Sequence, residues 1–286
     1  MNPTLLHTFI VPPIWLAALL AALLAGGSYA LRWLTLSGAI ATFCVGLVVY
    51  GLGQWQAAAP LLAFFISSSL LSKLGKLSKA ARGIPVEKGD RRNAWQVGAN
   101  GGLATAFVLL HYLLARHLTP TIMTLDRYLP MLFLAALATV NADTWATEIG
   151  SLAGGTPRLL SNWRPAPPGT SGAISFVGTL AAAGGAFFIP LCAYRLWPIA
   201  TPELITIAWA GFLGSFFDSI LGASLQGQFR DAVTGEPTEQ NASNGKPAIL
   251  LRGLRWVNND MVNLLASIGG ALCAWALLRY GVYPFQ

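Results

Sequence analysis

The sequence is poor in charge. Only 10% of its 286 residues are Asp, Glu, Lys or Arg, whereas about a quarter of the residues of an ordinary soluble domain are charged. Hydrophobic residues make up 55% of the chain and fall into long apolar runs that need lipid around them. This composition excludes a soluble nucleic-acid-binding protein and a disordered tail, and it predicts an integral membrane protein.

Cysteine and histidine are also scarce. The three cysteines, Cys44, Cys192 and Cys273, stand far apart in apolar segments, which argues against a zinc site or a disulfide framework. The sequence has no Walker A motif, no GxGxxG followed by an acidic residue, and no Ser/His/Asp or Cys/His arrangement. Any catalysis must therefore use other side chains.

Apolar runs of about 17 to 25 residues, the length that a helix needs to cross the hydrocarbon, occur along most of the chain. They predict one all-α domain over residues 1–286, a transmembrane helical bundle of about eight spans. Pro12 and Pro13 leave open whether the first run spans fully or lies at the interface. The predicted spans are residues 9–30, 34–52, 57–72, 94–115, 128–151, 172–196, 203–226 and 257–279.

The basic residues give an orientation. With both chain ends outside the cytoplasm, only Arg116, Arg127, Arg195 and Arg279 of the 18 Lys and Arg residues lie on the outer side, as the positive-inside rule requires. The long connections, near 73–93, 152–171 and 227–256, are then all cytoplasmic, so we expect the active site on that side. The basic stretch 73–93 either binds anionic lipid heads or a phosphorylated substrate, and 230–246 is expected to be a solvated loop.

Four carboxylates lie within the predicted spans, where ionisable groups are costly and commonly functional. Asp143 and Glu148 belong to the segment NADTWATEIG, Asp218 to GSFFDSILG and Asp260 to NNDMVN. At 100° per residue the polar residues of NADTWATEIG occupy one half of the helix, so this helix lines something wet or charged. The alternative is a packed polar face with one structural ion pair.

Amide side chains form a second polar group. Asn93, Gln96 and Asn100 share one face of the run 94–115, and Asn263 shares a face of the run 257–279 with Asp260. They either join helices, at about 0.6 kcal/mol per hydrogen bond, or complete a single polar cavity with the carboxylates.

Clustered carboxylates without a balancing cation favour Mg²⁺, which takes one or two protein oxygens and completes its shell with water and substrate phosphates. Basic side chains next to the helix ends would spread charge on a transferring phosphoryl group. The segment PPGTSGAIS, with Thr170 and Ser171, precedes a helix and either caps it or binds an anion. The candidate charge neutralisers are Arg91, Arg92, Arg158 and Arg164.

Five ordered segments resemble the membrane protein family that includes plant phytyl-phosphate kinase and animal transmembrane protein nineteen. In addition, Asp143, Ala146 and Gly150 fit the D-x-x-A-x-x-x-G spacing of CTP-dependent lipid kinases and cytidylyltransferases. The five segments are RRNAWQVGANGG (91–102), NADTWATEIG (141–150), PPGTSGAISFVGTLA (167–181), GSFFDSILGASLQ (214–226) and NNDMVNLLAS (258–267).

The resemblance implies a Mg²⁺-dependent kinase that transfers phosphate from a nucleoside triphosphate, with CTP as a candidate donor, to a prenyl monophosphate lipid in the membrane. Its expected ligands of metal and triphosphate are Asp143, Glu148, Asp218 and Asp260, and Asn100, Asn259 and Asn263 are expected to position the substrates. Two alternatives stay open: a CTP-dependent lipid cytidylyltransferase, and a transporter or flippase of a phosphorylated lipid.

Overall fold

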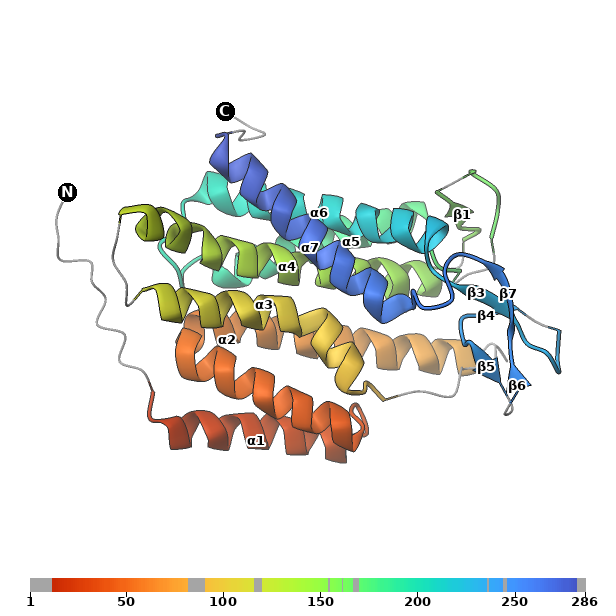
Figure 1. The fold of residues 1–286 in the computed structure, drawn as a ribbon, viewed down its shortest axis with the longest axis horizontal. Coiled ribbons are helices and arrows are strands. Elements are labelled where there is room, and N and C mark those ends of the chain that lie inside the picture. Colours follow the sequence, from red (N-terminus) through yellow and green to blue (C-terminus); the bar gives the residue numbers. More distant parts are fainter. Residues whose placement is uncertain are drawn as a thin grey trace.

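The computed structural model is a bundle of long helices with short strands gathered at one end (Figure 1). We call this end the strand end. The structure describes residues 12–81, 91–115, 120–153, 155–160, 162–166, 170–235, 237–243 and 246–281. The helices are α1 (Ile14–Ala30), α2 (Leu36–Ala81), α3 (Ala94–Leu114), α4 (Pro120–Leu152), α5 (Phe176–Ala193), α6 (Thr201–Ser224) and α7 (Asn259–Arg279).

Helix α2 is a helical hairpin rather than one rod. Its backbone leaves the helical region at Gln54, where φ is 53° and ψ is −155°. Ala39 and Phe65 belong to one hydrophobic cluster, although a straight helix would hold them about 39 Å apart at 1.5 Å per residue. The two halves therefore run antiparallel, as Figure 1 shows, and they correspond to the predicted spans 34–52 and 57–72.

Six helices of the described chain are long and apolar enough to cross a membrane. Counting the halves of α2 separately and adding the shorter apolar helix α1, which begins directly after Pro13, gives the expected number of about eight passes. Exposed aromatic side chains lie at both ends of the bundle, as in the aromatic belts of membrane proteins. They are Trp95, Trp163 and Trp256 at the strand end, and Trp15, Trp55 and Tyr280 at the other.

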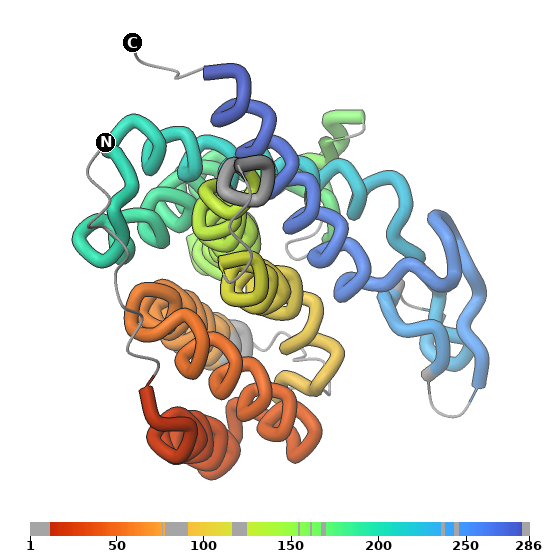
Figure 2. Tube along the Cα trace, turned by 60° about the vertical axis from the view of Figure 1, so that its left-hand side comes forward, coloured from red at the N-terminus to blue at the C-terminus, as the bar shows by residue number. Residues whose placement is uncertain are grey.

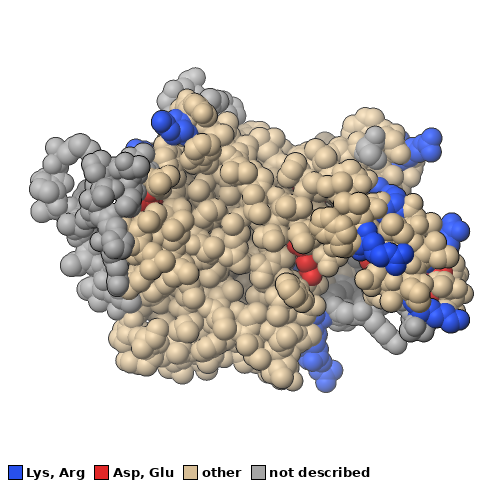
Figure 3. Space-filling view, in the orientation of Figure 1, with Lys and Arg blue, Asp and Glu red and all other residues tan. Residues whose placement is uncertain are grey.

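Charge is distributed asymmetrically between the ends. In Figure 3 the Lys and Arg side chains gather over the strands, and the flank of the bundle between the two ends is almost free of charge. This arrangement matches an apolar band in lipid with its basic end in water, and it follows the bias of the sequence.

Helix α4 lies at the centre, between α3 on one side and α5, α6 and α7 on the others (Figure 2). Small residues allow this packing: a Cβ on Gly185 of α5 would stand 3.1 Å from the Ala142 Cα, and one on Gly214 of α6 would stand 3.1 Å from the Gly270 Cα. Such close approach is typical of membrane helix interfaces, where van der Waals contact replaces the hydrophobic effect.

Asn141, fully buried in α4, joins three helices. Its amide nitrogen donates to the Gly185 carbonyl at 2.7 Å, and its oxygen accepts from the Ser67 hydroxyl at 3.2 Å. The Trp145 indole in turn donates to Ser67. The first polar residue of NADTWATEIG therefore stabilises the contact of α2, α4 and α5.

Two sequence expectations about the strand end need correction. The segment 230–246, expected to be a solvated loop, is largely exposed but carries the short strands β4 (Pro237–Thr238) and β5 (Ala242–Ser243). Strand β3 (Gln228–Arg230) pairs with β4 and with β7 (Ile249–Arg252) in an antiparallel sheet around the buried Phe229. The sixth span begins at Phe176 rather than at 172, since the chain is extended in β2 before the helix starts. The strands are β1 (Arg158–Leu159), β2 (Ala173–Ile174), β3 (Gln228–Arg230), β4 (Pro237–Thr238), β5 (Ala242–Ser243), β6 (Lys246–Pro247) and β7 (Ile249–Arg252).

Candidate functional site

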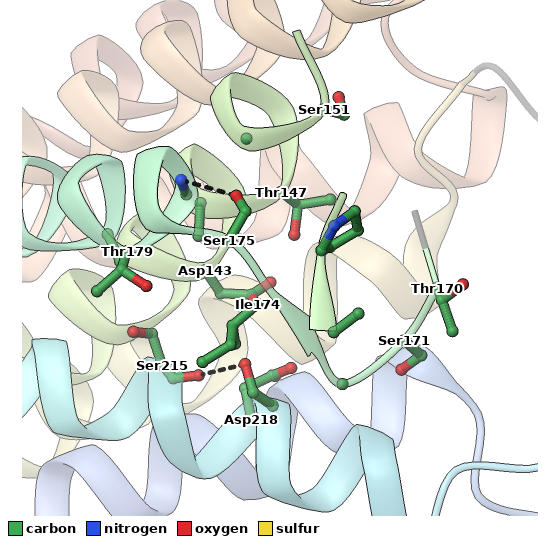
Figure 4. A pocket seen from close by; sticks show the side chains of 18 of the residues that line it. Asp143, Thr147, Ser151, Thr170, Ser171, Ile174, Ser175, Thr179, Ser215 and Asp218 are labelled. Atoms are coloured by element: carbon green, nitrogen blue, oxygen red, sulfur yellow. Dashed lines mark hydrogen bonds between the residues drawn. The ribbon is translucent and has the colours of Figure 1, made fainter. Parts of the chain in front are cut away.

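A cavity of about 390 Å³ opens near the strand end, between α4, α5 and α6 and beneath the segment 170–175 (Figure 4). Carboxylates and hydroxyls dominate its polar lining, and none of the lining residues that the structure describes is basic. The polar lining residues are Gln96, Asp143, Thr147, Ser151, Thr170, Ser171, Ser175, Thr179, Ser215, Asp218, Ser219, Glu239 and Asn259.

Asp143 of α4 and Asp218 of α6 face the cavity from opposite walls (Figure 4). The two carboxylates repel each other, and Asp218 is only 8% exposed. One carboxylate oxygen of Asp218, Oδ2, is buried and has no hydrogen-bond partner. An unpaired buried carboxylate is costly, so this oxygen is available to accept a hydrogen bond or to bind a cation.

The D-x-x-A-x-x-x-G spacing has a structural explanation, since Asp143, Ala146 and Gly150 all line the cavity. A Cβ on Gly178 of α5 would stand 3.0 Å from the Ala146 carbonyl oxygen, and a Cβ on Gly150 would stand 3.1 Å from the Gly178 Cα. The small residues thus hold the start of α5 directly against α4, beside the Asp143 carboxylate.

The segment with Thr170 and Ser171 covers the cavity and is tied to the end of α6. The Ser171 hydroxyl lies 2.6 Å from the Gln226 carboxamide oxygen, and the Arg252 guanidinium donates to the carbonyls of Ser171 and Ala223. Gly172 has a φ of +76° and packs on Ala223, where a side chain would meet backbone. Strand β7 therefore positions the cover through Arg252.

Three helices contribute a residue of their cap or first turn to the cavity lining. Gln96 is the third residue of α3, Ser175 caps α5 by accepting from the Gly178 N–H at 3.0 Å, and Asn259 is the first residue of α7. Helix N-termini offer free N–H groups and a partial positive charge to phosphate groups. The cavity can thus take a cation at its carboxylates and an anion at its helix ends.

Glu148 does not line this cavity. Its carboxylate packs over Gly75 of α2 and acts electrostatically on Arg92. Burial lowers the pKa of the Arg92 guanidinium, and attraction by Glu148 opposes that shift. Arg92 also anchors the chain before α3, since its backbone N–H donates to the Trp33 carbonyl and its carbonyl accepts from Thr35.

Other predicted site residues also lie outside the cavity. Asn263 donates to the Asn100 oxygen at 3.0 Å, so this amide pair joins α7 to α3. Asp260 is half-buried in the first turn of α7, where a carboxylate stabilises the helix dipole. The exposed Arg158 donates to the Trp163 carbonyl, while Arg91 and the exposed Arg164 are absent from the lining.

Sequence reasoning missed several lining residues. Thr179 of α5 and Ser215 and Ser219 of α6 were not among the predicted site residues. Gln96 had been left as either a helix-joining amide or part of a polar cavity. Glu239, another lining residue, lies in the segment 230–246, which was expected to be a solvated loop. The faint polar arc of Ser215, Asp218 and Ser219 was the available signal for the α6 wall.

No group of three or more His, Cys, Asp or Glu among the described residues is arranged to hold a metal ion alone. Proteins nevertheless commonly bind Mg²⁺ with only one or two carboxylates, and substrate phosphates and water complete the coordination shell. Asp143 and Asp218, with the unpartnered Asp218 oxygen, fit this donor set.

The fold and the cavity define a multi-pass membrane protein with a carboxylate-bearing polar site near one end. The chain belongs to the family described as integral membrane protein DUF92, whose model matches residues 19–271, and this confirms the family resemblance of the sequence motifs.

Three relatives illustrate the family. The chain is 30% identical to Protein PGR of Arabidopsis thaliana over 270 residues, covering 88% of this chain and 91% of the relative. It is 25% identical to Protein VTE6, chloroplastic, of the same plant over 276 residues, covering 94% and 73%. An uncharacterized membrane protein of Methanocaldococcus jannaschii is 28% identical over 241 residues, covering 84% of each chain. No solved structure matches the chain.

Proposed function

We propose that this protein is a Mg²⁺-dependent membrane kinase that transfers the terminal phosphate of a nucleoside triphosphate to a prenyl monophosphate. The observation that carries the proposal is the pair Asp143 and Asp218, which face each other in a cavity whose described lining residues include no Lys or Arg and which the first residues of three helices reach. The resemblance to the phytyl-phosphate kinase family supports the prenyl acceptor, and the placement of Ala146 and Gly150 supports CTP as donor.

In this proposal Asp143 and Asp218 hold Mg²⁺, which neutralises charge on the triphosphate when bound. The N-termini of α5 and α7 and the hydroxyls of Thr170 and Ser171 bind phosphate oxygens. Glu148 and Asp260 take no direct part, because neither side chain lines the cavity.

The reaction needs no general base. An oxygen of the prenyl phosphate attacks the terminal phosphorus of the nucleotide, the bond from that phosphorus to the bridging oxygen breaks, and the nucleoside diphosphate leaves with that oxygen. The acceptor is already an anion at neutral pH, so no proton has to be removed, and catalysis is mainly positioning and charge neutralisation. We place the site on the cytoplasmic side because the basic residues gather at the strand end.

The test is to incubate purified protein with Mg²⁺, each nucleoside triphosphate and a panel of prenyl monophosphates. The proposal expects prenyl diphosphate and nucleoside diphosphate in equal amounts. Release of pyrophosphate with a CDP-linked lipid would instead identify a cytidylyltransferase. Movement of a phosphorylated lipid across vesicles without nucleotide consumption would identify a transporter.

A further inference from the structure

The cavity extends from the strand end down into the membrane-spanning part of the bundle. Along α5 its lining runs from Ser175, the cap, to Ala182, which lies about 9 Å below the first residue of the helix at 1.5 Å per residue. Along α6 it reaches Ser215 and Phe216, about 12 Å from the last residue of that helix. A phosphate at Asp143 and Asp218 therefore lies below the strand-end surface.

The deep part of the cavity is bounded by α5 and α6 themselves. Figure 4 shows Thr179 on the α5 wall and Ser215 on the α6 wall, with Asp143 between them on α4. Thr179 and Phe216 line the cavity and are both partly exposed. They mark a lateral boundary between the polar interior and the outside of the bundle.

The surfaces beside this boundary are apolar. On α5, Phe176 is 78% and Leu180 58% exposed, and on α6, Leu213 and Ile220 are each nearly half exposed. These side chains lie at the depth of the cavity and contact lipid in a membrane-embedded bundle. A polar cavity next to an apolar outer surface suits a ligand with an anionic head and a hydrocarbon tail.

We infer that the lipid acceptor enters sideways between α5 and α6, with its phosphate at Asp143 and Asp218 and its tail passing Thr179 and Phe216 into the bilayer. This inference rests on the proposed function for the acceptor's chemistry. It specifies that the lipid enters between α5 and α6, and that Thr179 and Phe216 control its access to the cavity. The nucleotide then approaches separately from the strand end, beneath the segment 170–175.

A second, apolar cavity offers a rival path for the tail. It measures about 50 Å³, lies between α1, α2 and α3, and shares Gln96 with the main cavity. Its volume is about one eighth of that of the main cavity, and neither Asp143 nor Asp218 lines it. We therefore favour the opening between α5 and α6.

The first test locates the tail without relying on catalysis. Wild-type protein in lipid nanodiscs is irradiated with a long-chain prenyl monophosphate that carries a diazirine in the middle of its chain, and the labelled peptides are identified. We expect labelling of 179–187 and 213–220 that excess unlabelled long-chain prenyl monophosphate suppresses. Suppressible labelling of α1, α2 and α3, or no suppressible labelling, would overturn the lateral opening whether or not the protein is a kinase.

The second test uses activity. Thr179→Trp narrows the opening, whereas the matched change Leu180→Trp places the same side chain on the lipid-facing side of α5. Thr179→Trp should lower kcat/KM for a phytyl-length monophosphate at least about tenfold relative to Leu180→Trp, and should spare a water-soluble monophosphate with one isoprene unit. Equal losses for both substrates, or no loss, would overturn the inference. Wild-type protein inactive with both would instead count against the proposed function.

Discussion

Gly150 of α4 lies against Gly178 of α5 so closely that a Cβ on Gly150 would stand 3.1 Å from the Gly178 Cα and 3.1 Å from the Ser175 hydroxyl. This contact fixes the start of α5 beside Asp143. Gly150 lies in the last turn of α4, and its lack of a side chain allows this close contact.

Adding one methyl group at this contact should therefore be harmful. Gly150→Ala is expected to destabilise the protein by about 1–3 kcal/mol through overpacking against backbone atoms and to lower activity by displacing α5. Gly98→Ala is the matched control, because that helical glycine has open space around its Cβ position. Thermal unfolding of both variants measures the difference, and equal melting temperatures would contradict the tight contact.

Most of the fold could be predicted from the sequence, because span length and hydrophobicity are local properties. The limits of α3, α6 and α7 agree with the predicted spans within two residues, and the hairpin in α2 was visible as two apolar runs. The folding of 230–246 could not be predicted, because its strands have two or three residues each and are held by pairing with one another and, through β3, with β7. Strands this short carry no clear periodicity.

The sequence predicted a polar candidate site that carries carboxylates, but it did not predict all of the residues that line it. Asp143 and Asp218 could be found because a carboxylate in an apolar run is unusual. Helical angle alone did not show that Glu148 stays outside the cavity lining. Its carboxylate packs over Gly75 of α2 and acts electrostatically on Arg92 as well as on Asp143. The sequence allowed Asn100 and Asn263 either to join helices or to line a polar cavity. The hydrogen bond between them supports the helix-joining role.

The hairpin turn of α2 should be strained. Gln54 has a φ of 53° with a ψ of −155°, a combination that side chains with a Cβ disfavour. Gln54→Gly should therefore stabilise the protein by about 1–2 kcal/mol, whereas Gln56→Gly, within the following helical half, should destabilise it by about 0.5–1 kcal/mol. Thermal unfolding in the same detergent tests both, and a lower melting temperature for Gln54→Gly would contradict the strain.

Orientation can be measured with single cysteines in a background where the three native cysteines are replaced. Ala232→Cys, in the segment 230–246 at the strand end, should react with an impermeant maleimide only from the cytoplasmic side. Ala200→Cys, directly before α6, should react only from the other side. Both alanines are exposed, so both thiols are accessible, and the reversed pattern would move the proposed site to the other face of the membrane.

Substitution of Asp143 or Asp218 should affect activity far more than substitution of Asp260. Asp143→Asn and Asp218→Asn keep the size of the side chain but remove a charge, so each should nearly abolish diphosphate formation, and any residual activity of Asp218→Asn should need more Mg²⁺. Asp260→Asn should retain activity, because this carboxylate does not line the cavity. Initial rates over a range of Mg²⁺ concentrations, with a melting temperature for each variant, make the comparison. Full activity of folded Asp143→Asn would rule out its metal role.

Arg92 and Glu148 should contribute jointly to the free energy of unfolding, and their substitution should have little direct effect on phosphate transfer. Arg92→Ala removes a positive charge that attracts the Glu148 carboxylate, and Glu148→Gln removes the carboxylate that opposes the lowering of the Arg92 pKa. Each single change is expected to destabilise the protein. The double variant should recover part of the loss, with a coupling free energy of about 0.5–3 kcal/mol, as is usual for charges in one network.

A phosphate-binding role for Arg92 makes a different prediction from this structural pairing. If Arg92 binds a substrate phosphate, Arg92→Ala should raise KM for nucleotide or prenyl phosphate, and adding Glu148→Gln should not restore it. If its partner is Glu148, the double variant should recover the wild-type KM together with part of the stability. Measuring unfolding and both KM values across the four proteins of the cycle separates these roles, and we expect the stability coupling with little change in KM because Arg92 does not line the cavity.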